Sequence, residues 1–369
     1  MQEASRGKTI IIAAGGTGGH LFPAQALARD LESQDPTYSL VFMGKGLTTN
    51  PFFHRELFAY KEVSAASPSS KKRLKSYFAL IRGIWQAYFL LKKLCPVLVV
   101  GFGSFHAFPV LVAAFLRRVP LVLFESNSVP GKVNRLFSSK AVCSGVQFPS
   151  AAKYMKGKCV EVQMPFWRSF SSDITRIEAA AYFSLEPDVF TFLIFGGSQG
   201  AAKLNSSLIE ALASLKSLGY SFQVIHLVGG SASLEKIQEL YAASNIPSCI
   251  KSFEDRMDLA WTLAGGAVCR SGAATLAELM LFSVPSLLIP YPHASENHQL
   301  KNALFLQNEV GGALLLEEKD LSFNELKNKL ESLLSLKTNI GMRDHINRFK
   351  KNTQNISLLD LIRKSLDCL

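Results

Sequence analysis

The chain has 369 residues, more than the ~250–300 at which a single hydrophobic core stops growing, so two domains are expected. Hydrophobic residues make up 48% and charged residues 19%, which excludes a disordered, collagen-like or coiled-coil chain. Residues 1–166 carry 21 Lys and Arg against 8 Asp and Glu, and the remainder carries 19 against 21. The basic excess therefore belongs to one half, which points to a local anionic partner.

Short apolar runs alternate with longer amphipathic segments along the chain, which predicts βαβ units, parallel sheets and helices on both faces. The first five expected strands are Thr9–Ala14, Ser39–Met43, Leu98–Gly101, Leu121–Phe124 and Ala141–Cys143. After about Phe166 the alternation restarts, with expected strands at Thr191–Phe195, Gln223–Val228, Ala267–Cys269 and Ser286–Ile289. The two series predict two domains of the same class.

Each half opens with a strand that runs into a glycine-rich turn, at Gly15–Gly19 and again at Gly196–Gly200. The expected fold class is therefore α/β, with two Rossmann-like domains facing a cleft. Residues 1–166 and a returning C-terminal helix over residues 349–369 are assigned to the first domain, and residues 167–348 to the second.

No run of ~18 uncharged apolar residues is present, so a membrane-spanning helix is not expected. The apolar stretch near the N-terminus is too short for a signal peptide and leads into glycines. The six cysteines are scattered without a C-x-x-C pair, which favours reduced thiols. These features predict a protein made and kept in the cytoplasm.

A glycine-rich turn that opens a helix presents unpaired N–H groups and the positive end of the helix dipole, a combination that binds phosphate. The alternative for either turn alone is a tight backbone bend. A dinucleotide fingerprint is disfavoured because Leu21 stands where its third glycine belongs, and the second strand ends at Gly44 without an acidic residue. A P-loop is excluded because neither turn is followed by G-K-[ST].

These motifs, taken in order, resemble the MurG family of N-acetylglucosaminyltransferases over nearly the whole chain. The matching segments are Gly15–His20, Phe22–Ala24, Gly196–Ala201, Asn205, Cys269–Ala273, Glu278, Pro290–His293, His298–Gln299 and Asn302–Ala303. The resemblance implies a GT-B fold and UDP-N-acetylglucosamine as the donor. It further implies lipid I, an undecaprenyl-diphosphate-linked muramyl peptide, as the acceptor, and an inverting transfer that gives a β-1,4 linkage in lipid II.

No Asp-x-Asp occurs in the chain, which removes the usual carboxylate pair for a diphosphate-bound metal, so no metal site is expected. No other cofactor is expected either, and N–H groups and helix ends must stabilise the departing UDP. The resemblance assigns donor contacts to Thr17, Gly18, Gly19, Asn127, Arg168, Ser198, Gln199, Glu254, Ala273, Ala274, Thr275, Leu276, Ala277, Glu278 and Gln299. Within this set, the Glu278 carboxylate would accept from the ribose diol, and the loop backbone at Glu254 would face the uracil. Simpler alternatives are a helix cap for Ser198 and a helix-stabilising charge for Glu278.

An inverting transfer needs a base for the acceptor hydroxyl, and His20 is the leading candidate because an unperturbed histidine titrates near pH ~6.5. A structural histidine that caps its helix is the simpler alternative, and His106 and Glu125 are other candidate bases. The resemblance places the acceptor diphosphate at the turn formed by Gly101, Gly103, Ser104 and His106. Ser104 and Phe105 depart from the G-x-G-G-Y pattern of the family.

The segment Lys71–Lys93 contains seven basic and no acidic residues. Leu74, Phe78, Ile81, Trp85 and Tyr88 form one helical stripe, and Leu80, Ile84 and Leu91 lie off it. A basic-flanked helix of this kind suits adsorption to an anionic membrane surface, and a core helix with solvated ends is the alternative. No nucleic-acid partner is expected, because no DNA- or RNA-binding motif is visible.

The expected protein is therefore a peripheral enzyme at the cytoplasmic face of the bacterial plasma membrane. Two alternatives remain at this point. One is another UDP-sugar enzyme of the same fold, such as a glycolipid synthase or a UDP-N-acetylglucosamine 2-epimerase. The other is a nucleotide-sugar-binding protein without catalytic activity.

Overall fold

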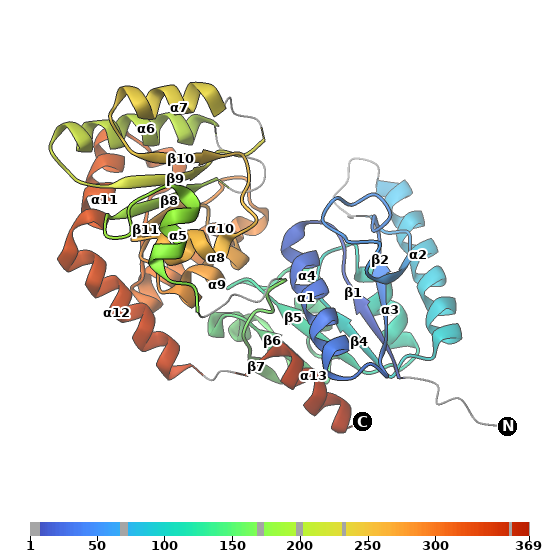
Figure 1. The fold of residues 1–369 in the computed structure, drawn as a ribbon. Helices are drawn as coiled ribbons and strands as arrows, with labels where there is room; N and C mark the ends of the chain where they lie inside the picture. Colours follow the sequence, from blue (N-terminus) through green and yellow to red (C-terminus); the bar gives the residue numbers. More distant parts are fainter. Residues whose placement is uncertain are drawn as a thin grey trace. The chain divides into compact units, whose positions relative to one another are not determined.

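The computed structural model describes residues 8–66, 73–167, 173–196, 202–230, 234–353 and 356–368. The chain forms two compact units, Met1–Ser169 together with Gln354–Leu369, and Phe170–Thr353 (Figure 1). Both units are built from a parallel sheet and helices, as the alternating pattern predicts. The expected strands are confirmed, although β6 begins and ends two to three residues later than expected.

The described part of the first unit contains a seven-stranded sheet in the order β3-β2-β1-β4-β5-β6-β7. Its strands are β1 (Thr9–Ala13), β2 (Ser39–Gly44), β3 (Ala59–Glu62), β4 (Leu98–Gly101), β5 (Leu121–Glu125), β6 (Cys143–Val146) and β7 (Cys159–Glu161). Its helices are α1 (Gly18–Gln34), α2 (Arg73–Leu94), α3 (Phe108–Leu116), α4 (Lys132–Phe137), the 3-10 helix η1 (Pro149–Tyr154) and α13 (Leu358–Asp367).

The first sheet is buried on both faces. Strand β1 pairs in parallel with β2 and β4, with Ile11 opposite Val41 on one side and Val99 on the other. These residues share a core with Ala87 of α2 and Val110 of α3. Because side chains alternate along a strand, the neighbouring isoleucines of β1 face the other layer, and all are fully buried.

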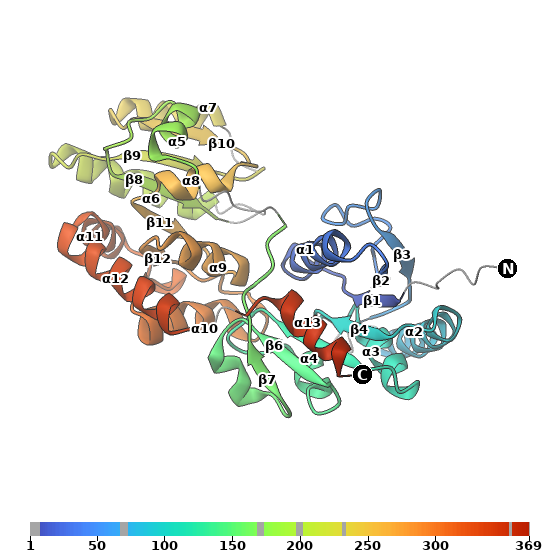
Figure 2. The same cartoon turned by 60° about the horizontal axis from the view of Figure 1, so that its bottom comes forward.

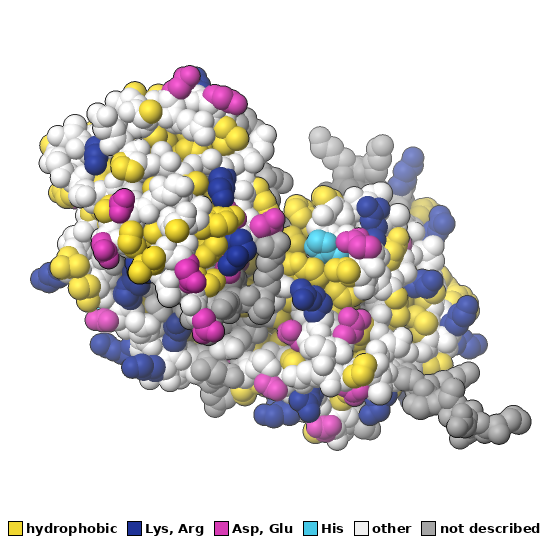
Figure 3. All heavy atoms as spheres, viewed as in Figure 1, with side chains coloured by type: hydrophobic (Ala, Val, Ile, Leu, Met, Phe, Trp, Pro, Cys, Tyr) yellow, Lys and Arg dark blue, Asp and Glu magenta, His cyan; other side chains and the backbone are white. Residues whose placement is uncertain are grey.

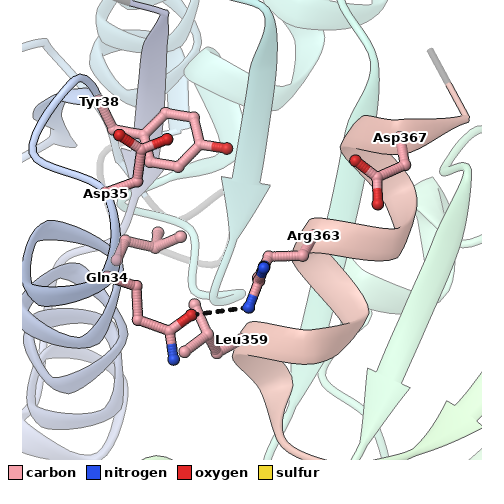
Figure 4. Close-up of a pocket in the computed structure, with 7 residues that line it drawn as sticks. Gln34, Asp35, Tyr38, Leu359, Arg363 and Asp367 are labelled. Carbon is pink, nitrogen blue, oxygen red and sulfur yellow. Dashed lines mark hydrogen bonds between the residues drawn. The ribbon is translucent and has the colours of Figure 1, made fainter.

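Helix α13 returns the chain to the first unit and lies beside α1 (Figure 2). Ser357 and Asp360 form a capping box at its start. The Arg363 guanidinium then donates to Gln34 Oε1 at 2.9 Å, across a cavity of about 230 Å³ between the two helices (Figure 4). The sequence predicts one closing helix over residues 349–369, and this start is wrong: α12 of the second unit continues to Asn352, and the closing helix α13 begins only at Leu358.

Helix α2 has two apolar faces. Leu80 and Leu91, which lie off the predicted stripe, are buried in the core, whereas Phe78, Ile81 and Trp85 of the stripe are exposed. Tyr88 of the stripe is half-buried and packs against the core, and the side chain of Leu74 lies outside the described residues. Exposed large hydrophobic side chains on α2 are Tyr77, Phe78, Ile81, Trp85 and Phe89. Figure 3 shows Lys and Arg side chains among hydrophobic ones along the edge of the unit that α2 forms. No helix in the described ranges is both long and apolar enough to cross a membrane.

The described part of the second unit contains a six-stranded sheet in the order β10-β9-β8-β11-β12-β13. Its strands are β8 (Thr191–Phe195), β9 (Gln223–Leu227), β10 (Ser248–Lys251), β11 (Gly266–Cys269), β12 (Ser286–Leu288) and β13 (Ala313–Leu315). Its α-helices are α5 (Arg176–Phe183), α6 (Ala202–Ser217), α7 (Leu234–Ala243), α8 (Met257–Leu263), α9 (Ala273–Phe282), α10 (His298–Leu304), α11 (Phe323–Leu334) and α12 (Leu336–Asn352). The 3-10 helices η2 (Ser295–Asn297) and η4 (Glu318–Asp320) and the π-helix η3 (Phe305–Val310) complete the unit.

The core of the second unit packs α6, α7 and α11 against one face of the sheet. Phe192 of β8 is fully buried with Leu208 of α6, Ile237 of α7 and Leu326 of α11. Helix α8 contacts both α5 and α9. Strand β8 is therefore central in the sheet, and its packed core residues hold its carboxyl end at Phe195 in place.

Candidate active site

The candidate site of the first unit lies where the strand order reverses. Strand β1 is flanked by β2 on one side and by β4 on the other. The chain adds β2 and β3 on one side of β1 and then β4 to β7 on the other side, so the direction of the strand order changes between β1 and β4. In open parallel sheets, ligands bind beyond the carboxyl ends of the strands at such a point. The turns after β1 and β4 carry Thr17–His20 and Gly103–His106, which brings these two predicted groups of residues together.

His20 connects the two turns. Its Nδ1 lies 2.8 Å from the carbonyl oxygen of Phe102. Because a carbonyl oxygen only accepts hydrogen bonds, Nδ1 carries the proton, and a neutral His20 therefore has its lone pair on Nε2. This bond joins α1 to the turn after β4, in contrast to a bond that would cap α1 itself.

The start of α1 is open to solvent. Thr17 is the N-cap residue of α1, but its side chain makes no capping hydrogen bond. Thr17 and Gly19 are exposed, and Gly18 is half-buried. The predicted residues thus place the positive end of α1 next to the Thr17 hydroxyl, which does not cap the helix. This combination is suited to binding an anionic group.

Ser104 and His106 form a pair next to the first glycine turn. The Ser104 Oγ lies 2.9 Å from His106 Nδ1 and accepts from the His106 backbone N–H at 3.2 Å. Burial, together with nearby Lys45 and His20, lowers the pKa of His106. A Cβ at Gly16, whose φ is +92°, would lie 3.0 Å from His106 Nδ1, so glycine allows the two turns to approach closely.

The two glycines predicted at the acceptor turn have different structural roles. Gly101 is buried, and a Cβ there would lie 2.9 Å from methyl groups of both Leu111 and Leu123, so packing accounts for this glycine. Gly103 has a φ of +77°, and a Cβ there would lie 3.1 Å from the side chain of Asn134. Gly103 therefore provides the bend that presents the turn, whereas Gly101 closes the core beneath it.

Glu125 supports a loop, which argues against its alternative role as the base. It is 3% exposed at the end of β5 and accepts from the backbone N–H groups of Asn127 and Gly131 at 2.9 and 3.0 Å. The Asn134 Nδ2 donates to the same carboxylate at 2.9 Å, and the Asn127 Nδ2 donates at 3.2 Å. The Asn127 amide is thus held in place by Glu125 at the carboxyl end of the sheet.

The second unit repeats this arrangement, because β8 is flanked by β9 and β11. The turn after β8 begins at Gly196, and the predicted contacts Ser198 and Gln199 lie outside the described residues, as does Arg168. The turn after β11 opens α9, and Gly272 is its N-cap residue, with no side-chain cap. The carboxyl ends of β8 and β11, which pair with each other, lie at the point where the strand order reverses.

The predicted donor segment at the start of α9 divides into two parts. Ala273–Thr275 form the first turn and are half-buried, so their backbone N–H groups belong to the positive end of the helix. The side chains of Leu276 and Ala277 are 0% and 8% exposed and belong to the core. Any ligand contact at these two positions must therefore come from the backbone.

Glu278 is a half-buried carboxyl group on α9. The indole Nε1–H of Trp261 donates to its Oε2 at 2.8 Å. Burial raises the pKa of Glu278 to about 7, although the bond from Trp261 acts in the opposite direction. At neutral pH this carboxyl group is therefore poised between its two protonation states.

Glu254 braces the loop after β10. It is 4% exposed and accepts from the Lys251 Nζ at 2.6 Å, the Arg256 backbone N–H at 2.7 Å and the Tyr182 hydroxyl at 3.1 Å. Burial alone would raise the pKa of Glu254, but these donors outweigh it and hold the pKa below its ordinary value. The carboxylate is occupied inside the protein, which leaves the loop backbone for contact with a ligand.

Gln299 lies at the start of α10 and is tied to the turn before α9. Its Oε1 accepts from the Tyr291 backbone N–H at 2.9 Å, and its carbonyl oxygen accepts from the Ser271 hydroxyl at 2.8 Å. The Asn302 side chain donates to the Ser271 carbonyl at 3.2 Å. These bonds orient the Gln299 amide group next to the start of α9.

Three residues at these sites were not predicted from the sequence. Asn50 donates to the Gly16 carbonyl at 2.6 Å, Asn134 joins Glu125 to the Phe124 carbonyl, and Trp261 holds Glu278. None lies in a glycine-rich motif. The only available signal was a polar or aromatic residue in a loop or helix that follows a predicted strand, which is too common to single them out.

Comparison with known proteins relates the chain to one group of enzymes. Residues 10–144 match the glycosyltransferase family 28 N-terminal domain, and residues 191–357 match the C-terminal domain of that family. The UDP-N-acetylglucosamine--N-acetylmuramyl-(pentapeptide) pyrophosphoryl-undecaprenol N-acetylglucosamine transferase of Protochlamydia amoebophila is 44% identical over 317 residues, covering 85% of this chain and 84% of the relative. The protein of the same name from Chlamydia pneumoniae is 32% identical over 349 residues, covering 94% and 93%.

Solved structures give the same relationship. The crystal structure of MurG from Acinetobacter baumannii has a TM-score of 0.78 and 25% sequence identity, and the match covers 97% of this chain and 99% of that one. A UDP-glucosyltransferase from Polygonum tinctorium has a TM-score of 0.72 at 12% identity over 99% of both chains. The second likeness concerns the fold alone, which is the GT-B fold that the family resemblance implies.

Proposed function

The chain belongs to the MurG family of glycosyltransferases, and on that premise we propose that it transfers N-acetylglucosamine from UDP-N-acetylglucosamine to lipid I, giving lipid II for peptidoglycan. The observation that carries this proposal is the 44% identity to the Protochlamydia amoebophila transferase over 85% of the chain. The two glycine-rich turns at the switch points of the sheets supply the phosphate-binding chemistry that both substrates require.

The donor contacts are assigned chiefly to the second unit. The start of α9 offers backbone N–H groups to the diphosphate, the Glu278 carboxylate accepts from the ribose hydroxyls, and the loop at Glu254 faces the uracil. Gln299 is assigned to the sugar, with Arg168, Ser198, Gln199 and Asn127 as further contacts. Thr17–Gly19 add N–H groups from the first unit. Negative charge that builds on UDP is stabilised by these fixed dipoles.

The acceptor is assigned to the first unit, with its diphosphate at the turn formed by Gly103, Ser104 and His106. The acceptor hydroxyl attacks the anomeric carbon of the donor sugar, so that a new C–O bond forms as the C–O bond to UDP breaks. The proton of that hydroxyl passes to Nε2 of His20, which carries the lone pair because Nδ1 donates to Phe102. The configuration at the anomeric carbon is inverted in this single displacement.

The outward face of α2 is assigned to the membrane surface that contains the lipid acceptor. Its exposed aromatic and aliphatic side chains would enter the headgroup region, and the basic residues between Lys71 and Lys93 would attract anionic lipid, at roughly 1 kcal/mol each near the surface. We therefore assign the enzyme to the cytoplasmic face of the plasma membrane as a peripheral protein.

The experiment is to incubate the purified protein with UDP-[14C]N-acetylglucosamine and a short-chain lipid I analogue, and to separate the products by chromatography. A labelled β-1,4-linked disaccharide lipid is expected. Conversion of the donor to UDP-N-acetylmannosamine would instead identify an epimerase. Binding of UDP without any turnover would identify a nucleotide-sugar-binding protein, and either result would contradict the proposal.

A further inference from the structure

Trp261 is buried among three segments that the proposed function assigns to the donor. It is 1% exposed on α8 and is the bulkiest of the fully buried side chains in the described ranges. Its helix follows the loop that contains Glu254. No sequence motif singled it out, and its side chain is too deeply buried to bind a ligand directly.

The hydrogen bond of Trp261 has a fixed direction. The indole N–H is only a donor, and it lies 2.8 Å from Glu278 Oε2. Within the described part of the second unit, Trp261 is the one side chain that donates to this carboxylate. A glutamate has three side-chain torsions, and a single short bond from an immobile ring selects one orientation of its carboxyl group.

The ring itself is held by two aromatic neighbours. Phe195, the last residue of β8, packs on it edge to face, with centroids 5.7 Å apart and an interplanar angle of 83°. Phe282 of α9 lies stacked at 6.4 Å and 18°. The indole is therefore fixed relative to the strand that leads into the second glycine turn and to the helix that carries Glu278.

We propose that Trp261 is a positioning residue for nucleotide recognition, which holds the Glu278 carboxylate in the orientation that accepts the ribose hydroxyls. This rests on the proposed function, in which Glu278 contacts the ribose. A carboxylate fixed before the ligand arrives loses less side-chain freedom on binding. The hydrogen bond from Trp261 therefore contributes to the preference for a ribonucleotide, and it does not contribute to binding of the diphosphate or the base.

The test compares the affinities of UDP and 2′,3′-dideoxy-UDP, measured by calorimetry on the full-length protein. Hydrogen bonds to a charged group are strong, so the wild-type protein is expected to prefer UDP by on the order of tenfold to a hundredfold. Trp261→Phe removes the N–H and keeps an aromatic ring. It is expected to reduce this preference to less than about threefold, while the affinity for the dideoxy nucleotide changes by less than about threefold.

Phe282→Leu is the matched control, because it disturbs the same ring packing without removing the N–H donor, and it should retain the preference for UDP. If Trp261→Phe fails to fold, as judged by thermal unfolding, the tryptophan is replaced by 3-benzothienylalanine, in which sulfur stands in place of the N–H. Retention of the full UDP preference in either Trp261 variant would overturn the inference. A wild-type protein that binds neither nucleotide would instead overturn the proposed function.

Discussion

The Nδ1 of His20 lies 2.8 Å from the carbonyl oxygen of Phe102, so the helix after β1 and the turn after β4 are joined by a hydrogen bond of fixed direction. The bond determines the tautomer of the neutral imidazole, and the lone pair lies on Nε2. A histidine that only caps a helix does not need this cross-link between two turns. The arrangement is the one expected of a base whose orientation is set by a second group.

His20→Asn is expected to lower kcat by roughly 10²- to 10⁴-fold, because the asparagine amide can still donate to Phe102 but cannot accept the proton of the acceptor. The affinity for UDP, measured by calorimetry, should remain unchanged. His345→Asn is the control, because the His345 Nδ1 also lies near a backbone carbonyl oxygen, that of Gly311 at 3.3 Å. A His20→Asn enzyme with more than a third of the wild-type kcat would contradict the assignment of the base.

Ser104 has a φ of +71°, a conformation that is unfavourable for any residue with a Cβ. Ser104→Gly and Ser104→Ala both remove the hydroxyl that bonds to His106, but only glycine relieves the backbone strain. The glycine variant should therefore be more stable than the alanine variant by about 1 kcal/mol in urea unfolding.

The same pair of substitutions at Ser33, an exposed position in α1, serves as the control. There the order of stability should reverse, because alanine is the better helix former, although the difference in the last turn of α1 should be smaller than the ~1 kcal/mol of a helix interior. Equal stability of the two variants at position 104 would show that the turn relaxes when the hydroxyl is lost.

Burial raises the pKa of Glu278 to about 7, so the affinity for UDP should depend on pH in the neutral range. The carboxylate form accepts hydrogen bonds most strongly, and it is lost as the pH falls through about 7. The Kd for UDP is therefore expected to rise severalfold between pH 8 and pH 6. The Glu278→Gln variant is the control, because any change of its Kd with pH comes from ionisation of the nucleotide itself. If the Kd depends on pH in the same way in both proteins, an ionised Glu278 is ruled out as a ribose ligand.

The strands that the sequence did not predict share one position in the fold. Strands β3, β7, β10 and β13 are the four edge strands of the two sheets. They are three or four residues long and mostly half-buried or exposed, so they lack the continuous apolar run that identifies a central parallel strand. The central strands were predicted because both of their faces are buried.

The candidate site shows a similar division. Residues in glycine turns could be found because a strand, a turn and a helix follow one another in the sequence. The bonds that orient them could not, since Trp261 and Glu278 lie 17 residues apart on different helices. The burial of Leu276 and Ala277 could not be predicted either. The helical pattern shows which residues share a face of α9, but not which face packs against the sheet.

The outward face of α2 should mediate adsorption to lipid. Replacement of Phe78, Ile81 and Trp85 by glutamine is expected to reduce binding to vesicles that contain phosphatidylglycerol at least tenfold in a sedimentation assay. Because these side chains are 54% to 73% exposed, the free energy of unfolding should change by less than about 1 kcal/mol.

A matched triple variant uses three exposed hydrophobic residues of the second unit. Ile177, Leu218 and Leu336 are 60% to 75% exposed, and their replacement by glutamine should leave vesicle binding intact. Equal losses in both triple variants would indicate nonspecific hydrophobic adsorption and not a membrane-binding face on α2.

A buried polar network in the second unit predicts that the folded protein loses stability at acidic pH. The Tyr241 hydroxyl lies 2.9 Å from His226 Nδ1, and His226 Nε2 lies 3.3 Å from Asn205 Oδ1. The Asn205 amide donates to the Val228 carbonyl, so Nε2 of His226 carries the proton and Nδ1 accepts from tyrosine. This network fixes the first turns of α6 against the end of β9.

Burial lowers the pKa of His226 to about 4, below the value of ~6.5 in an unfolded chain. The unfolded protein therefore binds more protons below pH ~6.5, and stability is lost as the pH falls from about 6.5 towards 4, by up to about 3 kcal/mol. The glutamine of His226→Gln can accept from Tyr241 and donate to Asn205, but it does not titrate. The difference in pH-dependent stability between the two proteins therefore measures the contribution of His226 alone. Urea unfolding at pH 7 and pH 5 should show a loss about 2 kcal/mol larger for the wild-type protein, and equal losses would mean that His226 is protonated in the folded state.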